Sequence, residues 1–305
     1  MLQGSDFLPA SWRGEGTRIT RFAPSPTGFL HLGHAYSAQF AYEAARAAHG
    51  QFLLRIEDID RQRCRPEFEQ ATREDLLWLG LRWDRQVRRQ SEHWGDYERA
   101  LARLRQKGVL YPCFCSRRQI QHEVEEADRA PHGPSGEPVY PGTCRRLTPA
   151  EREARMAREP FAWRLDVAKA RALTGRLTWI DCRAGEISAD PESLGDVVLA
   201  RKDTPTSYHL SVTVDDAIQG VTLVTRGEDL FHATHIHRLL QALLELPTPR
   251  WYHHNLLADR NGQRMSKRNR AMTLRHRRDL GDSPADIWRA IGLTGHVTAE
   301  PALVV

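Results

Sequence analysis

Residues 17–59 read as a strand, a breaker, a helix and a second strand, and this order constrains the fold more than any other feature. "TRITRFA" (17–23) alternates polar and apolar residues as a strand does, and "PSPTG" interrupts it. An alanine-rich helical pattern follows in "HLGHAYSAQFAYEAARAAHG", closed by Gly50, before "QFLLRIEDI" continues as a mostly buried strand. Two strands joined by a helix make a βαβ unit, so the sequence predicts a parallel sheet in an α/β fold.

The rest of the chain alternates helical and strand-like patterns around one atypical segment. Helical patterns occupy 66–81, 96–108 and 234–246, and β-type patterns occupy 196–203, 207–218 and 221–230. Residues 113–160 hold clustered cysteines, a Pro/Gly-rich run and a charged helix, "PAEREARMAREP". We interpret this segment as part of an insertion in the sheet domain.

Composition places the chain among globular proteins. Apolar residues make up 40%, and no apolar run approaches the roughly 18–20 residues of a membrane span. The polar start predicts a disordered tail over residues 1–17. A net charge of +5 fits a polyanionic partner such as RNA, although only four of the 44 basic residues are lysine and an arginine excess also reflects genome composition. Five cysteines, an odd number, indicate a reducing compartment and hence the cytoplasm.

The segment "RFAPSPTGFLHLGH" (21–34) predicts a phosphate site. A strand ends, prolines stiffen the turn, and the chain enters a helix whose first N–H groups favour phosphate. His31 and His34 lie around the first turn and can both face a triphosphate, and Gly33 lets a base or ribose approach the backbone. Taken alone, the same residues are also consistent with two surface histidines near a turn. The distant segment "NGQRMSKRNRAMTL" (261–274) reads as a second, basic phosphate-binding loop.

Together these two segments resemble the paired signatures of class I aminoacyl-tRNA synthetases. "HLGH" resembles their HIGH motif and "RMSKR" (264–268) their KMSKS loop. The resemblance implies that ATP, carried with Mg²⁺, is bound by both segments, and that His31, His34 and Lys267 stabilise charge on its α-phosphate. The ATP-binding residues that it implies are His31, Gly33, His34, Arg264, Met265, Ser266 and Lys267. Arg264 replaces the first lysine and keeps its charge, whereas Arg268 replaces the last serine.

Four motifs, "RFAPSPTG…HLGH", "RIEDID", "WLGLRWD" and "VTLVTRGEDL", resemble the glutamyl-tRNA synthetase branch over about residues 18–275. Glutamate has two carboxylates and one ammonium, and arginine holds a carboxylate through paired hydrogen bonds. By resemblance Arg21 and Arg226 hold the carboxylates and Glu57 holds the ammonium, with no assignment of which arginine takes which carboxylate. The other residues of the implied glutamate site are Phe22, Ala23, Pro24, Ser25 and Tyr208. Asp58 and Asp60 are interpreted as structural.

Three of the five cysteines predict a zinc site. Cys113, Cys115 and Cys144 lie close in sequence, and thiolates bind Zn²⁺ tetrahedrally. A fourth ligand is needed, and composition alone leaves several candidates, with a histidine favoured: His122, Asp128, His132 and Tyr140. A shortened relative of the glutamyl synthetases carries Cys-x-Cys followed by Tyr-x-x-x-Cys and uses the tyrosine oxygen, so the resemblance implies Cys113, Cys115, Tyr140 and Cys144. Cys64 and Cys182 are interpreted as ordinary thiols.

That shortened relative is the glutamyl-Q tRNA(Asp) synthetase family, and the end of the chain resembles it as well. After the second loop only "RRDLGDSPADIWRAIGLTGHVTAEPALVV" remains. We expect one or two short helices packed on the sheet domain and no anticodon-binding domain, which needs about a hundred residues or more. The resemblance implies activation of L-glutamate with ATP and its transfer to queuosine in the anticodon loop of tRNA(Asp), by a chain expected to be a monomer.

The predicted organisation is a disordered tail (1–17), a discontinuous Rossmann-type catalytic domain (18–107 and 197–260), an inserted acceptor-binding-like subdomain with the zinc site (108–196), and a KMSKS-type loop with a short helical C-terminal segment (261–305). Three other functions are weighed against this one. They are a truncated glutamyl-tRNA synthetase charging the 3′ end of tRNA(Glu), a small-molecule nucleotidyltransferase, and a synthetase-like RNA-binding module without activity. The predicted glutamate site disfavours the second, and His31, His34 and Lys267 disfavour the third.

Overall fold

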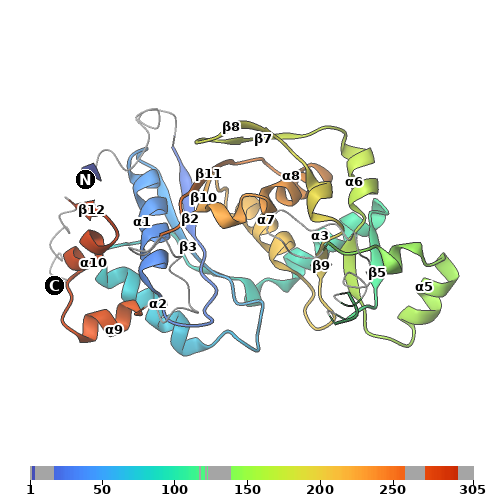
Figure 1. The fold of residues 1–305 in the computed structure, drawn as a ribbon, viewed down its shortest axis with the longest axis horizontal. Coiled ribbons are helices and arrows are strands. Elements are labelled where there is room, and N and C mark those ends of the chain that lie inside the picture. The colour runs from blue at the N-terminus through green and yellow to red at the C-terminus, as the bar shows by residue number, and fades with distance from the viewer. Residues whose placement is uncertain are drawn as a thin grey trace. The chain divides into compact units, whose positions relative to one another are not determined.

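The structure is a computed structural model that describes residues 2–3, 17–116, 118–120, 122, 139–257 and 272–294. Its elements fall into two compact units (Figure 1). The first consists of Met1–Ser91, Val221–Glu228 and Trp251–Val305, and the second of Glu92–Gly220 and Asp229–Arg250. Within the described ranges, no helix combines the length and hydropathy needed to cross a bilayer.

A parallel sheet forms the centre of the first unit and confirms the predicted α/β fold. β2 (Ile19–Phe22) pairs in parallel with β3 (Gln51–Ile56), from Ile19 opposite Gln51 to Phe22 opposite Leu54. The short strand β4 (Arg88–Arg89) continues the sheet beyond β3. β10 (Leu223–Gly227) lies beside β2, where Thr222 N donates to Ile19 O at 2.9 Å, and is hydrogen-bonded to β11 (Arg250–His254).

Helix α1 (Leu32–Arg46) connects β2 to β3 and packs on β2, β3 and β10 (Figure 1). Small side chains let the helix approach the sheet closely, because an alanine occupies little volume at the contact. The buried alanines of α1 are Ala35, Ala38, Ala41, Ala44 and Ala45. The alanine-rich pattern in the sequence therefore marks the face that contacts the sheet.

The end of this helix differs from the prediction. We expected Gly50 to close the helix, but α1 ends at Arg46 and the left-handed residue is His49, with φ of 49°. Gly50 is required for a different reason. A Cβ atom at Gly50 would lie 1.8 Å from Arg18 O, the carbonyl that accepts a hydrogen bond from Gln51 N at 2.8 Å. The absent side chain thus lets β3 start directly beside β2.

Further elements of the first unit, within the described residues, are three helices and two short strands. α2 (Pro66–Trp78) contacts α9 (Leu274–Asp279), and α10 (Pro284–Ala290) packs on α1. These two C-terminal helices agree with the sequence prediction. The expectation of a disordered tail needs correction at one point, because β1 (Leu2–Gln3) pairs in parallel with β12 (Leu293–Thr294).

The second unit combines an antiparallel sheet with a group of helices. β5 (Leu110–Cys113) and β9 (Val198–Ala200) flank β6 (Ala162–Leu165), and β7 (Thr178–Asp181) forms a hairpin with β8 (Gly185–Ser188). Its described helices include α3 (Trp94–Gln106), α5 (Pro149–Met156), α6 (Val167–Thr174), α7 (Tyr208–Ile218) and α8 (Ala233–Leu244). Short 3₁₀ turns lie in this unit at Thr143–Arg146 (η3) and Pro191–Leu194, and at two points where the chain passes from the first unit to the second, Gln90–Glu92 and Glu228–Leu230.

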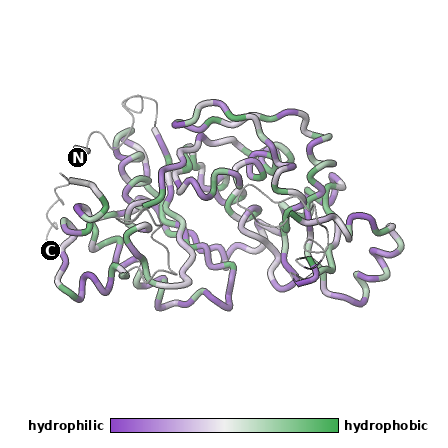
Figure 2. The backbone as a smooth tube through the Cα atoms, viewed as in Figure 1, coloured by the Kyte–Doolittle hydropathy of each residue, from purple (hydrophilic) through white to green (hydrophobic). Residues whose placement is uncertain are grey.

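Apolar residues of α3, α7 and α8 form a shared core in this unit, with Leu104, Leu210 and Leu239 fully buried. By contrast α5 contributes no buried residue, and hydrophilic residues dominate it (purple in Figure 2). The charged pattern of α5 in the sequence is therefore that of a helix exposed on the unit's surface.

One secondary-structure prediction was wrong. Residues 207–218 alternate apolar and polar side chains and were expected to form a strand, but they form helix α7. Seven consecutive residues from Leu210 to Asp216 are buried, so the helix has no polar face to produce a 3.6-residue period. Asp215 accepts a hydrogen bond from Tyr97 Oη at 2.9 Å, and Thr213 Oγ1 donates to His209 O at 2.8 Å. Because Asp215 and Thr213 have hydrogen-bond partners, they can be buried on the helix without a large energetic cost. A sequence with strand-like alternation can therefore fold as a helix.

We expect Gly50→Ala to destabilise the first unit, because the added methyl group meets a backbone carbonyl that cannot rotate away. The expected loss in the free energy of unfolding is about 1–3 kcal/mol or more, the usual cost of overpacking. Gly95→Ala is the matched control. Its added Cβ would meet only Arg99 Nη1 at 3.4 Å, at a helical position that favours alanine. Urea unfolding measures both variants, and equal stability of the two would contradict the role given to Gly50.

Candidate functional site

Three of the residues predicted to bind glutamate lie where strands of the first unit end. Arg21 is the third residue of β2, Glu57 follows β3 directly, and Arg226 lies near the end of β10. Arg21 Nη1 donates to Thr225 O at 3.3 Å, and Thr222 lies beside Ile19, so β10 runs in the same direction as β2. The carboxyl ends of parallel strands are where open α/β sheets bind their ligands. The structure thus brings the three charged groups to this edge.

The loop after β2 fastens Glu57 to this edge. Glu57 N donates to Pro24 O at 3.0 Å, and Thr27 N donates to Ser25 O at 2.8 Å. Phe22 and Pro24 are buried, Ala23 is half-buried and Ser25 is exposed. The predicted segment 21–25 therefore runs past Glu57, with the serine at the surface.

Each of two predicted ligand-binding groups has a buried partner that sequence reasoning missed. Arg55 is fully buried on β3, and its Nη2 donates to Glu57 Oε1 at 3.1 Å. Arg226 Nε donates to His253 Nε2 at 3.1 Å, with both side chains buried. Buried charges need partners of this kind. The signal available in the sequence was weak: Arg55 stands in an apolar strand, and His253 is one of two adjacent histidines.

His31 and His34 cap the start of α1. His31 Nδ1 accepts a hydrogen bond from Gly33 N at 3.1 Å, and His34 Nδ1 accepts one from His31 N at 3.2 Å, which is a reciprocal capping box. The two rings lie with their centroids 3.9 Å apart. A Cβ at Gly33 would lie 3.0 Å from the His31 ring, so this glycine leaves room for that ring. The structure therefore adds a folding role to the predicted phosphate site.

The predictions for Arg264, Met265, Ser266 and Lys267 lie outside the described residues. On both sides of that segment, described residues contact α1 or the turn before it. His254, at the end of β11, has its Nε2 3.0 Å from Ser37 Oγ. After the segment, Leu274 N donates to Leu30 O at 2.8 Å, and Thr273 forms a β-bridge with His31. The chain thus leaves and returns close to the predicted ATP motif.

Tyr208, the remaining predicted glutamate residue, lies in the second unit as the first residue of α7. Its ring contacts those of His209 and His237, with centroids 5.7 and 5.6 Å away. His209 Nδ1 lies 3.3 Å from His237 Nε2. Within its own unit, therefore, Tyr208 is held against two imidazoles.

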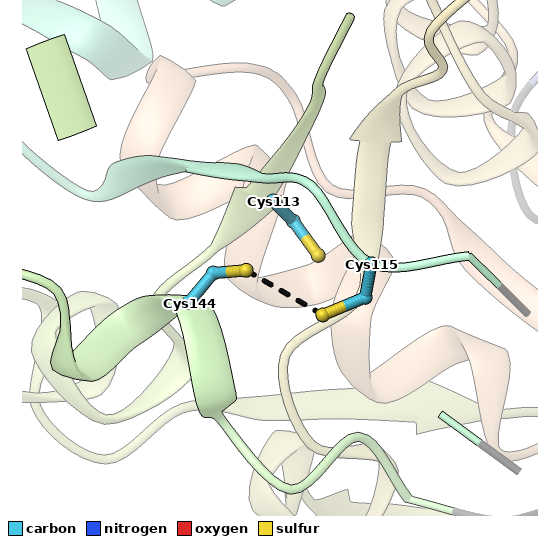
Figure 3. Close-up of side chains that lie close together, drawn as sticks. All are labelled: Cys113, Cys115 and Cys144. Atoms are coloured by element: carbon cyan, nitrogen blue, oxygen red, sulfur yellow. Dashed lines mark hydrogen bonds between the residues drawn. The ribbon is translucent and has the colours of Figure 1, made fainter. Parts of the chain in front are cut away.

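The second unit gathers the predicted metal ligands. The sulfur atoms of Cys113, Cys115 and Cys144 point toward one another and lie within 4.8 Å (Figure 3). Tyr140 Oη lies 3.5 Å from the sulfur of Cys113 and 3.6 Å from that of Cys115, and the sulfurs of Cys115 and Cys144 are 3.5 Å apart. Tetrahedral Zn²⁺ with ordinary bond lengths places sulfur about 3.8 Å from sulfur and about 3.5 Å from oxygen. These three distances fit such a tetrahedron.

Of the other candidates for fourth ligand, the described His122 is exposed, and Asp128 and His132 lie outside the described residues. The described cysteines that remain, Cys64 and Cys182, form no disulfide bond within the described residues.

The environment of this cluster affects ionisation. Burial raises the pKa of Cys115 to about 12, and burial together with the Cys113 thiol raises the pKa of Tyr140. Burial also opposes ionisation of Cys144, but hydrogen bonds from Phe114 N and Tyr140 outweigh it and lower the pKa of that thiol. Without a cation, Cys115 and Tyr140 therefore resist losing their protons. A metal ion bound between them would favour the deprotonated forms, which are the forms that bind a metal.

A buried carboxylate, that of Asp196, supports the elements around the cysteine cluster. Asp196 accepts hydrogen bonds from Tyr111 Oη at 2.6 Å, Arg145 Nη1 at 3.0 Å and Val167 N at 3.0 Å. These donors come from β5, from the turn beside Cys144 and from the start of α6. Asp196 thereby links three elements next to the metal ligands, and nothing in its sequence context predicted this.

Comparison with known proteins gives this architecture a family. A family model described as tRNA synthetases class I (E and Q), catalytic domain, matches residues 18–303. The chain belongs to this family, which confirms the resemblance found in its motifs.

A protein of Rhodobacter capsulatus named glutamyl-Q tRNA(Asp) synthetase is 51% identical over 283 residues, which are 90% of this chain and 100% of that protein. One of Symbiobacterium thermophilum with the same name is 44% identical, over 93% of this chain and 86% of that protein. A solved glutamate tRNA ligase of Elizabethkingia meningosepticum is 29% identical with a TM-score of 0.70, over 83% of this chain and 52% of that chain. This chain thus spans about half of the solved ligase.

Two replacements of His31 test its capping role in α1 apart from its predicted role in binding ATP. His31→Ala removes the acceptor for Gly33 N, and we expect it to lower the free energy of unfolding by about 1 kcal/mol. His31→Ser keeps a side-chain oxygen that caps a helix, so its stability should remain close to that of the unaltered chain. Urea unfolding of both variants measures the difference. Equal losses in the two would show that the cap contributes nothing.

Proposed function

We propose that the chain activates L-glutamate with ATP and transfers it to queuosine in the anticodon loop of tRNA(Asp). The observation that carries the first step is the group of Arg21, Glu57 and Arg226 at the strand ends, beside the histidine-capped start of α1. Two basic groups and one acidic group complement the two carboxylates and the ammonium of glutamate. The proposal for the acceptor is supported by the names of the relatives from R. capsulatus and S. thermophilum.

In the first step an α-carboxylate oxygen of glutamate attacks the α-phosphorus of ATP. The bond between that phosphorus and the bridging oxygen to the β-phosphate breaks, and glutamyl-adenylate and pyrophosphate form. Glutamate's carboxylate is already ionised at neutral pH, so positioning and charge stabilisation replace a general base. His31, His34 and Lys267 stabilise the developing charge, and Mg²⁺ accompanies the phosphates of ATP.

In the second step a hydroxyl oxygen of the acceptor attacks the carbonyl carbon of the adenylate. The bond from that carbon to the phosphate oxygen breaks, AMP leaves with the electron pair, and the hydroxyl proton passes to solvent or to a phosphate oxygen. We place this reaction in the cytoplasm with the chain as a monomer, and the net charge of +5 favours the approach of an RNA.

We further propose that Cys113, Cys115, Tyr140 and Cys144 hold one Zn²⁺ in a structural role. Four protein ligands fill the tetrahedral coordination of the ion, which is typical of structural rather than catalytic sites. The ion would thereby join β5 and the residues just after it, which carry Cys113 and Cys115, to η3, which carries Cys144. The ion takes no part in the chemistry described above.

The proposed reaction is tested in two assays on the full chain. We expect pyrophosphate exchange into ATP that depends on glutamate and needs no tRNA. Lys267→Ala should reduce it about 100-fold or more, because it removes positive charge at the phosphates. Lys169→Ala, which alters an exposed lysine of α6, is the control. With labelled glutamate, tRNA(Asp) that contains queuosine should be labelled, and tRNA(Asp) without it should not.

Labelling of tRNA(Glu), abolished by periodate treatment of its 3′ ribose, would instead favour a truncated glutamyl-tRNA synthetase. Absence of exchange with every amino acid would contradict the enzymatic function altogether and favour an RNA-binding module.

We expect the purified chain to contain one zinc ion, measured by elemental mass spectrometry. Cys144→Ser should lose the ion and lower the melting temperature by several degrees, because metal binding adds to folding stability. Cys182→Ser, the matched control, should keep it. Equal metal content in the two variants would contradict the ligand set.

A further inference from the structure

His253 contacts one of the proposed glutamate-binding groups directly. Its Nε2 accepts a hydrogen bond from Arg226 Nε at 3.1 Å, and its side chain is 3% exposed while that of Arg226 is 6% exposed. The two residues lie on β11 and β10, which are neighbours in the sheet. A buried hydrogen bond to a charged group contributes more than one in water.

The orientation of His253 follows from the alternation of side chains along β11. Tyr252 and His254, the residues on either side, both contact Phe40 of α1, with ring centroids 4.7 and 5.4 Å away. Successive side chains of a strand point to opposite faces. His253 therefore points to the face of β11 opposite α1, and there it meets Arg226.

This hydrogen bond selects how Arg226 binds a carboxylate. A guanidinium can hold a carboxylate either through Nε and one Nη or through its two Nη atoms. Because Nε already donates to His253, a carboxylate bound to this guanidinium would meet its two Nη atoms. The bond also fixes the imidazole, since only a neutral ring with its proton on Nδ1 accepts at Nε2.

We propose that His253 is a positioning residue, which sets the guanidinium of Arg226 so that it binds a glutamate carboxylate through its two Nη atoms. This inference rests on the proposed function. The neighbouring residue adds to the effect, because Thr225 O accepts from Arg21 Nη1 at 3.3 Å. Two consecutive residues of β10 thus position both arginines of the proposed glutamate site, because Thr225 O binds Arg21 and the next residue is Arg226. From the adjacent strand β11, His253 fixes the orientation of the Arg226 side chain.

Two replacements test the role of the acceptor. His253→Leu removes it at similar volume, whereas His253→Gln keeps an oxygen that can accept near the position of Nε2. We expect the leucine variant to raise the KM for glutamate about 10-fold or more in pyrophosphate exchange, with the KM for ATP unchanged, since only the carboxylate contact is misaligned. The glutamine variant should stay within about 3-fold of the unaltered chain.

Control measurements address folding and specificity. His49→Asn replaces an exposed histidine in the same unit at a left-handed position that asparagine tolerates, and it should change neither KM. Thermal unfolding shows whether each variant is folded. Nitrogen-15 NMR of the imidazole in the unaltered chain should show a non-protonated, hydrogen-bonded Nε2, a readout independent of activity and of variant folding.

The outcomes separate the inference from the function on which it rests. An unaltered chain without glutamate-dependent exchange overturns the proposed function and this inference with it. An active chain whose leucine variant keeps its KM for glutamate overturns the inference alone. Three other results would overturn the inference as well. They are an equal increase in the KM values for glutamate and ATP in His253→Leu, a KM for glutamate in His253→Gln as high as in His253→Leu, and a protonated Nε2 in the unaltered chain.

Discussion

Close pairing of β2 with β3 is the constraint on which the first unit depends. The carbonyl of Arg18 accepts a hydrogen bond from Gln51 N and would lie 1.8 Å from a Cβ atom at Gly50, so only a residue without a side chain lets the second strand begin directly beside the first. Five buried alanines let α1 lie against this pair. Because the two strands are parallel and in register, Arg21 and Glu57 come to the same edge. The position of the site thus follows from backbone contacts remote from it.

Buried charge in both units is held by specific partners rather than left to solvent. In the first unit Arg55 accompanies Glu57 and His253 accompanies Arg226. In the second, Asp196 receives three donors from separate elements around the cysteine cluster. If a buried ionic group loses its partner, the folded state is strongly destabilised. The surrounding elements can therefore adopt only arrangements that keep the partner in place. The binding groups are therefore oriented by residues that carry no recognisable motif.

Sequence patterns predicted the βαβ start, the parallel sheet, the C-terminal helices and the family, because strand alternation, breakers and paired motifs are local signals. Helix α7 was missed because burial on all sides removes the helical period, and Gly50 was given a turn-forming role although it serves close approach. The gathering of Cys113, Cys115 and Cys144 followed from their spacing. Partners such as His253 and Asp196 could not be found, because no motif or characteristic spacing in the sequence marks their contacts.

The capping of α1 by two imidazoles has a consequence for acid conditions. Each ring uses Nδ1 to accept a backbone N–H, so a ring that takes up a proton there can no longer hold the first turn. The positive charge would also stand at the positive end of the helix dipole. Protonation of either ring at Nδ1 therefore removes one capping hydrogen bond, so acidification weakens the helix start through the two residues proposed to meet the nucleotide.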